Sequence, residues 1–123
     1  SKGNIMNKVA IVVLADTETM EALGRVVNAL EAVKEFKEAQ DDVQLIFDGA
    51  GTKWIAELSK PDHNYKHLFD AVKDKATGAC TYCANAFGVK EAVETSGIPF
   101  SGDYEGHPSF RQLVSQGYQI ITF

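Results

Sequence analysis

The segment KVAIVVLA, residues 8–15, limits the possible folds of this chain more than any other feature. It is an uninterrupted apolar run rich in β-branched residues, whereas a strand with one face in solvent would alternate apolar and polar residues. Such a run is typical of a parallel strand that is buried on both faces. The segment therefore predicts a sheet covered by helices on its two sides.

Helical and strand-like segments alternate along the rest of the chain. The first helix is expected to run from the polar stretch DTET to about Ala39, with Asp16 or Thr17 as its N-cap. Its apolar face is formed by residues at helical spacing, namely Leu23, Val26, Val27, Leu30 and Val33. The segments expected after it are a strand at 43–47, a short helix ending near Pro61, a helix at 65–72, a weak strand at 75–80, a helix from about Tyr82 to Val93, a short or edge strand near Pro99, a helix from Pro108 to Gly117 that buries Phe110, Leu113 and Val114, and a strand at 118–123.

This alternation predicts an α/β fold, a three-layer flavodoxin-like domain with a mainly parallel central sheet of about five strands. The strand order does not follow from the pattern. A length of 123 residues corresponds to a single domain, which we place at residues 8–123. Residues 1–7 are expected to be disordered or derived from an expression vector, with Met6 a candidate for the natural start.

The charge balance and the hydropathy argue against two classes of partner. The formal net charge is −5 and the basic residues form no run, so no nucleic acid is expected as a ligand. No apolar stretch approaches the roughly 20 residues that span a bilayer, so no membrane association is expected. The chain shows no secretory signal and has only two cysteines, which predicts a reducing, cytoplasmic location.

The loops at the carboxyl ends of the strands carry the candidate ligand sites, because ligands of open parallel sheets bind there. The loop ADTETM contains Asp16 and Thr17, but its acidic residues and its lack of glycine argue against a bound phosphate. Gly49 and Gly51 follow the second strand without the third glycine of a dinucleotide fingerprint. We interpret them as tight-turn glycines that leave space for a small ligand.

The segment CTYC, residues 80–83, holds both cysteines where the third strand gives way to a helix. Backbone amides and the helix dipole stabilise a thiolate at such a place, so the pKa of Cys80 is expected to lie below its ordinary value of about 8.5. Cys80 and Cys83 are therefore the candidate catalytic residues, and Thr81 and Tyr82 between them are expected to line the same pocket. The alternative is that both cysteines are ordinary core residues.

A zinc site would need ligands beyond the cysteine pair, and three histidines are the candidates: His63, His67 and His107. His63 and His67 share a helix face at i, i+4 spacing, but their segment is expected to face solvent. We therefore expect no metal and no cofactor. His107 precedes the last helix, where it either acts as an acid or base near the sulfur or caps the helix.

Several short motifs together resemble a known family. They are KVAIVVLADT at the start, LIFDGAG at the second strand, Cys80 followed by a helix with Gly88-Val89, and GYQIITF at the end. From about Lys8 onward the chain is similar to the DsrE/DsrF-like family of small sulfur-relay proteins. The resemblance implies a flavodoxin-like fold, homo- or hetero-oligomers, a cytoplasmic location and a persulfide carried on Cys80. Cys83 departs from the pattern, because the sulfur-transfer members have a small residue there.

The leading hypothesis is a sulfur carrier or sulfurtransferase in which Cys80 carries sulfane sulfur and Cys83 is a resolving thiol. Two alternatives stay open: a non-catalytic binding or assembly module, and a Cys-x-x-Cys thiol–disulfide protein. The expected partners are a sulfur-donor or acceptor protein and further copies of the chain in a dimer or trimer. Self-association is expected because aromatic residues on helices offer apolar surface, namely Trp54, Tyr65, Phe69 and Phe110.

Overall fold

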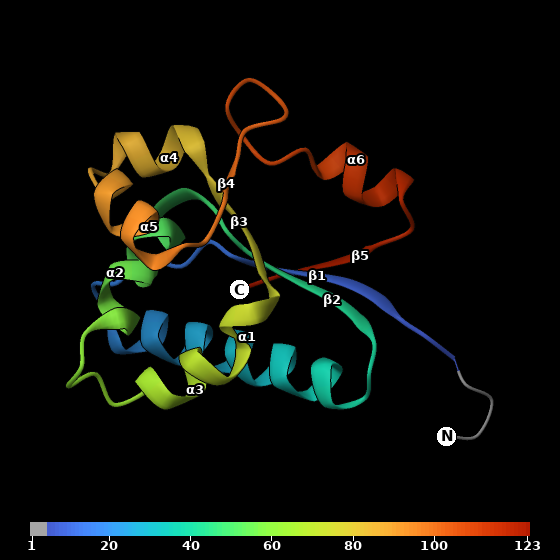
Figure 1. Cartoon of the computed structure of the whole chain (residues 1–123), viewed down its shortest axis with the longest axis horizontal. Helices are drawn as coiled ribbons and strands as arrows, with labels where there is room; N and C mark the ends of the chain where they lie inside the picture. Colours follow the sequence, from blue (N-terminus) through green and yellow to red (C-terminus); the bar gives the residue numbers. More distant parts are fainter. Residues whose placement is uncertain (1–4) are drawn as a thin grey trace.

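Five parallel strands form the central sheet of the computed structural model, which describes residues 5–123 (Figure 1). The strands are β1 (Lys8–Val13), β2 (Asp42–Phe47), β3 (Ala76–Cys80), β4 (Phe100–Ser101) and β5 (Gln119–Thr122). β1 pairs with β2 on one side and with β5 on the other, and all of its residues after the first are buried. The predicted α/β fold with a parallel sheet of about five strands is confirmed.

The strand order is β4-β3-β2-β1-β5, which the sequence pattern left open. It differs from the 2-1-3-4-5 order of flavodoxin itself. Strands β1 to β4 follow one another toward one edge, and the last connection returns across the sheet to place β5 beside β1. Because such connections are right-handed, the returning one carries its helix on the opposite face.

Within residues 5–123, helices α1 to α5 cover one face of the sheet and only α6 covers the other (Figure 1). The helices are α1 (Met20–Glu38), α2 (Trp54–Ser59), α3 (Lys66–Val72), α4 (Thr81–Ala86), α5 (Lys90–Ser96) and α6 (Phe110–Ser115), with the 3₁₀ helices η1 (Gly49–Lys53) and η2 (Lys73–Lys75). The larger core lies under α1 to α5, and the smaller one consists of Ala10, Val12, Ile46 and Leu113. None of the helices in the described part of the chain is long and apolar enough to cross a membrane.

Helix α1 begins two or three residues later than the predicted caps, Thr17 and Asp16, require. Its N-cap is Thr19, whose Oγ1 accepts a hydrogen bond from the N–H of Ala22 at 3.0 Å. The prediction of Asp16 or Thr17 as the cap was therefore wrong. The predicted apolar face of α1 does pack in the larger core.

Two later helices also differ from their predicted form. The helix expected to run through to residue 93 is two helices, because Gly88 has a positive φ of 71° and ends α4 before α5 begins. On α6, Leu113 is buried as predicted, but Phe110 and Val114 are exposed. A helix of six residues has fewer than two turns, so it directs only one apolar residue at the sheet.

The chain is tied to the domain from Asn7 onward. The backbone N–H of Asn7 donates to Asp41 Oδ1 at 2.9 Å, and its side chain donates to Oδ2 at 3.3 Å. Its carbonyl accepts a hydrogen bond from the N–H of Asp42 at 2.9 Å. Disorder was expected over residues 1–7, and for residues 1–4 that expectation lies outside the described residues.

The apolar surface that was expected to support self-association is smaller than the sequence suggests. Trp54 is only 3% exposed and Phe69 is fully buried, so neither is free to contact another chain. Tyr65 is partly buried against the core. Phe110 is exposed. Among these four aromatic residues it is the one that still supports the prediction of a dimer or trimer.

The connections after β3 and β4 leave the sheet toward opposite faces. α4 follows β3 on the face covered by α1 to α5, whereas α6 follows β4 on the other face. Neighbouring strands whose connections diverge in this way leave a crevice beyond their carboxyl ends. Cys80 ends β3 at this position, and Ser101 pairs with it at the end of β4.

We predict that Gly51→Ala lowers the free energy of unfolding, because an added Cβ would lie 2.1 Å from the carbonyl oxygen of Val13 in β1. Overpacking of this kind costs about 1–3 kcal/mol. Gly24→Ala in α1 is the matched control, since no atom lies within 4 Å of its added Cβ. Alanine stabilises a helix interior by about 0.5–1 kcal/mol relative to glycine. Chemical denaturation should therefore shift the two variants in opposite directions, and wild-type stability of Gly51→Ala would contradict this packing.

Candidate functional site

The register of β2 and β3 brings the first two residues of the candidate site together. Phe47 of β2 pairs with Ala79 of β3, so the residues that follow, Asp48 and Cys80, leave the sheet at the same level. β4 continues this alignment, because its Ser101 pairs with Cys80. Three strand ends therefore direct polar groups to one edge of the sheet.

Cys80 lies at the start of α4. Its Sγ accepts a hydrogen bond from the backbone N–H of Cys83 at 3.3 Å. On the side of the loop after β4, the sulfur lies 3.6 Å from the carbonyl oxygen of Gly106 and 3.3 Å from Nδ1 of His107. The thiol therefore has a backbone donor from its own helix, and a carbonyl and an imidazole from a distant loop.

A two-residue turn fixes His107 in the loop after β4. Tyr104 and His107 exchange two backbone hydrogen bonds of 2.9 and 2.8 Å. Glu105 and Gly106 between them both have positive φ, 50° and 84°, which is the geometry of a type I′ turn. The exposed ring of Tyr82 stacks on the imidazole with the ring centroids 4.9 Å apart. The imidazole is thus held by a backbone turn and by a stacked ring.

Cys83 completes a group of four side chains. Its Sγ lies 3.6 Å from Oδ1 of Asp48, and the same oxygen accepts a hydrogen bond from the N–H of Gly49 at 2.8 Å. One sulfur, nitrogen or oxygen atom from each of Asp48, Cys80, Cys83 and His107 lies within 4.8 Å of the other three. Both cysteines are free thiols, and both are buried, Cys80 completely. We call these four residues the thiol cluster.

An open groove of about 760 Å³ reaches the thiol cluster. The groove is lined by Asp48 and His107 of the cluster and by Tyr104, Pro108, Ser109, Phe110 and Arg111. Neither cysteine lines the groove, but each contacts a cluster member that does. A reagent in the groove therefore reaches the sulfurs when a cluster side chain or the turn moves.

The sequence profile of one protein family matches residues 7–123, nearly the whole chain. The chain belongs to the DsrE/DsrF-like family. An uncharacterized protein of Methanocaldococcus jannaschii is 34% identical to it over 87 residues, which are 71% of this chain and 70% of that protein. A solved structure of a conserved protein of unknown function from Bacteroides thetaiotaomicron is similar with a TM-score of 0.62 and 18% identity, over 93% of this chain and 94% of the other. At that identity the second comparison supports the fold alone.

The low pKa expected for Cys80 is wrong for this DsrE/DsrF-like chain. Burial raises the pKa of the Cys80 thiol to about 12. Hydrogen bonds with the Cys83 thiol and with Asp48 also raise this pKa, whereas the hydrogen bond from the backbone N–H of Cys83 lowers it. The helix that Cys80 precedes has only six residues, so its few aligned peptide dipoles do not offset the loss of water. The resting thiol is therefore protonated at neutral pH.

Two of the predicted pocket residues lie apart from the thiol cluster. Asp16 forms an ion pair with Lys53 at 2.7 Å, which holds the pKa of that carboxyl below its ordinary value. The N–H of Thr17 donates to the same carboxylate at 2.7 Å. None of the hydrogen bonds formed by residues 5–123 joins Asp16 or Thr17 to the cluster. These two residues order their own loop.

The other predicted pocket residues lie beside the cluster or under it. Thr81 borders Gly102 of the loop after β4, and Tyr82 covers the imidazole. Gly49 donates its N–H to the cluster carboxylate. Gly51 is buried so closely against β1 that it leaves no room for a ligand beside it.

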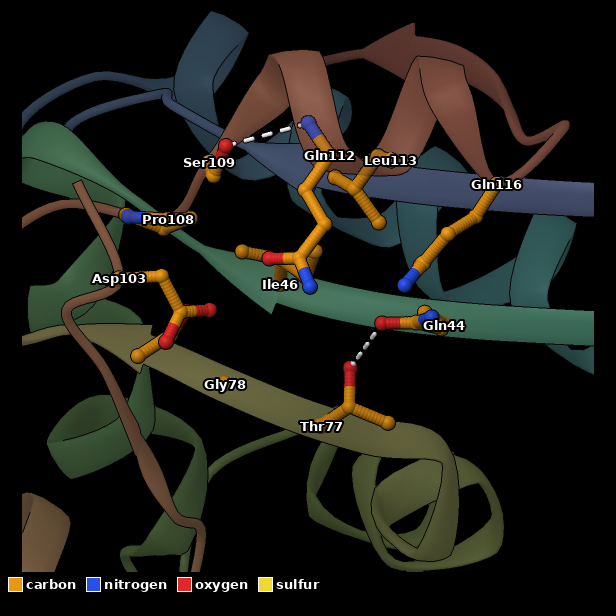
Figure 2. Close-up of a pocket in the computed structure, with 11 residues that line it drawn as sticks. Gln44, Ile46, Thr77, Gly78, Asp103, Pro108, Ser109, Gln112, Leu113 and Gln116 are labelled. Atoms are coloured by element: carbon orange, nitrogen blue, oxygen red, sulfur yellow. Dashed lines mark hydrogen bonds between the residues drawn. The ribbon is translucent and has the colours of Figure 1, made fainter.

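A second pocket lies on the other face of the sheet, beneath α6 (Figure 2). It has a volume of about 180 Å³. Gln112 of α6 and Gln116, the C-cap of that helix, extend toward the sheet, where Thr77 donates to Gln44 at 2.8 Å. Among the described residues that line it, only Asp103 is ionisable. Since neither a thiol nor an imidazole is among these lining residues, the thiol cluster remains the candidate for sulfur chemistry.

Sequence reasoning missed the roles of Asp48 and Gly106. The available signal for Asp48 was its place in a loop that directly follows a strand, where ligands of parallel sheets bind. The glycine before His107 marked a turn, and the alternative role of His107 as the helix cap belongs to Ser109. Neither signal specified that this loop folds back onto Cys80.

We predict that iodoacetamide modifies Cys80 more slowly in the folded, reduced, EDTA-treated chain than in the urea-unfolded chain at about pH 8. The raised pKa leaves little of this thiol ionised, and the thiolate is the reacting form. Peptide mass spectrometry after timed quenching gives separate rates for Cys80 and Cys83. A folded-state rate at Cys80 that equals or exceeds the unfolded-state rate would show that the sulfur is exposed and ionised.

Proposed function

We propose that this chain takes up sulfane sulfur on Cys80 and that Cys83 resolves the resulting persulfide. The observation that carries the proposal is the distance of 3.3 Å between Cys80 Sγ and His107 Nδ1, beside a second free thiol. Membership of the DsrE/DsrF-like family agrees with a sulfur-relay type of protein.

His107 supplies the base that a buried thiol needs. As Cys80 becomes a thiolate, Nδ1 accepts its proton, so ionisation moves a proton along one hydrogen bond instead of releasing it to distant solvent. The imidazolium then lies against the thiolate and balances its charge. The backbone N–H of Cys83 donates to the same sulfur and stabilises the negative charge further.

The first step moves one sulfur atom without net oxidation. The Cys80 thiolate attacks the terminal sulfur of a donor persulfide, R–S–SH. The donor's sulfur–sulfur bond breaks, a new one forms at Cys80, and the donor leaves as the thiolate RS⁻. The proton held on His107 is then available to that leaving group. Cys80 now carries the persulfide.

The second step uses Cys83, whose Sγ lies within 4.8 Å of Cys80 Sγ. After losing its proton, which points to Asp48 in the resting site, the Cys83 thiolate attacks Cys80 Sγ. The persulfide bond breaks, hydrosulfide leaves, and the two cysteines form a disulfide. The dithiol gives up two electrons and the sulfane sulfur gains them. An external dithiol then reduces the disulfide, unless an acceptor thiol removes the sulfur before Cys83 attacks.

We predict three different outcomes when the reduced chain meets glutathione persulfide. Wild type should lose two hydrogens and release one hydrosulfide per chain, because Cys83 resolves the persulfide. Cys83→Ser should keep the mass of one added sulfur atom at Cys80. Cys80→Ser should show neither change. Intact-mass and peptide mass spectrometry, with a hydrosulfide assay, distinguish the three.

A matched pair of histidine variants is the control for this prediction. His107→Gln should slow uptake at Cys80 by about 10²-fold or more, the usual effect of losing a general base. His63→Gln should keep the wild-type rate, because its ring packs on Trp54 away from the cluster. Sulfur found at a residue other than Cys80, or unchanged thiols in wild type, would rule the proposed function out.

A second candidate function is a binding or assembly module without catalysis. The complete burial of Cys80 and its raised pKa favour it, because a core cysteine is also dry and protonated. This function predicts that no variant gains or releases sulfur. A thiol–disulfide function, favoured by the proximity of the two sulfurs, predicts a Cys80–Cys83 disulfide under a mild oxidant without any sulfur donor.

A further inference from the structure

The thiol cluster contains the donor atoms of a protein zinc site. Zinc binds cysteine sulfur, histidine nitrogen and carboxylate oxygen, usually four of them in a tetrahedron. Cys80 and Cys83 come from the end of β3 and the start of α4, Asp48 from the end of β2, and His107 from the loop after β4. Magnesium and calcium prefer oxygen donors, so two sulfurs favour zinc.

The separations within the thiol cluster are close to those of a tetrahedral site. Zinc–ligand bonds of about 2.0–2.3 Å place neighbouring ligand atoms about 3.3–3.8 Å apart. Cys80 Sγ lies 3.3 Å from His107 Nδ1, and Cys83 Sγ lies 3.6 Å from Asp48 Oδ1. All four atoms lie within 4.8 Å of one another, so side-chain shifts of about 1 Å close the tetrahedron.

The charge of the cluster is not balanced by a side-chain cation. The ion pairs formed by residues 5–123 do not include Asp48, although this half-buried carboxylate contacts the buried thiol of Cys83. Buried charges in proteins are paired or coordinate metals. A divalent cation held by Asp48 and two thiolates satisfies that requirement.

Backbone groups already orient two of the four ligands. The N–H of Cys83 donates to Cys80 Sγ at 3.3 Å, and the N–H of Gly49 donates to Asp48 Oδ1 at 2.8 Å. Outer hydrogen bonds of this kind fix metal ligands and tune their charge. The groove that reaches Asp48 and His107 gives an ion its path of entry.

We propose that the thiol cluster is a tetrahedral Zn²⁺ site with Asp48, Cys80, Cys83 and His107 as its ligands. Binding releases the two thiol protons to the buffer, and the ion takes their place between the sulfurs, the carboxylate and the imidazole. The inference goes beyond the proposed function, because it requires the four side chains and no sulfur transfer. Four protein ligands leave no open position, so the metal-bound chain holds both thiols closed to sulfur donors.

Cobalt serves as the probe, because tetrahedral Co²⁺ with thiolate ligands has strong visible and near-ultraviolet bands. We expect the reduced, metal-free full chain to bind one Co²⁺ with both sets of bands, and an equimolar amount of Zn²⁺ to displace it. Weak absorption typical of six-coordinate Co²⁺, or the absence of saturable binding, would overturn the proposal. This titration needs no variant and does not depend on the folding of one.

Substitutions then assign the ligands. Asp48→Asn and His107→Gln should each weaken Zn²⁺ binding at least about tenfold, and Cys83→Ser should also reduce the sulfur-to-cobalt band. Asp103→Asn and His63→Gln, which replace an acid and a histidine outside the cluster, should bind as wild type does. Wild-type affinity in Asp48→Asn or His107→Gln would overturn this ligand set, provided that circular dichroism shows the variant folded.

The two proposals fail separately. Sulfur uptake at Cys80 by a chain that binds neither Co²⁺ nor Zn²⁺ would overturn the metal site and leave the proposed function in place. Tight Zn²⁺ binding by a chain that never takes up sulfur would support the metal site and remove the proposed function. Zn²⁺ should raise the unfolding temperature of wild type, because it binds the folded state, and should raise that of Asp48→Asn by less. Equal rises in the two chains would count against Asp48 as a ligand.

Discussion

The parallel pairing of β3 between β2 and β4 is the interaction on which the candidate site depends. Backbone hydrogen bonds hold Ala79 level with Phe47 on one side and with Phe100 on the other, so three strands end together. The connections after β3 and β4 then diverge, and His107 enters the space between them. A register shift of one residue would turn Cys80 to the opposite side of the sheet and dissolve the cluster.

The exclusion of water decides the chemical state of the sulfurs. Burial disfavours a thiolate at Cys80, and its surroundings offer three ways to accommodate the charge or remove it. They are proton transfer to His107, a covalent bond to another sulfur, and coordination of a divalent cation. Proton transfer to His107 frees an electron pair on Cys80, and a covalent bond to sulfur or coordination of a cation then uses that pair, so the last two states exclude one another. Burial therefore keeps the Cys80 thiol protonated in the resting site.

Local patterns predicted the elements, and long-range packing set the site. The apolar run of β1 and the spacing along α1 reflect burial directly, so the fold class followed from the sequence. The place of Cys80 at a strand end followed as well, but its pKa did not, since loss of water depends on the whole packed chain. The contacts of His107 with Cys80 and of Asp48 with Cys83 cross 27 and 35 residues. They depend on the strand order, which no local pattern encodes.

The site chemistry depends on the contact between His107 and Cys80, and ¹⁵N NMR of the imidazoles tests that contact most directly. The chain has three histidines, so His63 and His67 serve as internal references. Replacing Cys80 by alanine removes the sulfur that lies 3.3 Å from His107 Nδ1. We predict that the Nδ1 resonance of His107 moves in Cys80→Ala while the resonances of the other two histidines stay in place. An unmoved His107 resonance in a folded Cys80→Ala chain would contradict the contact and the site built on it.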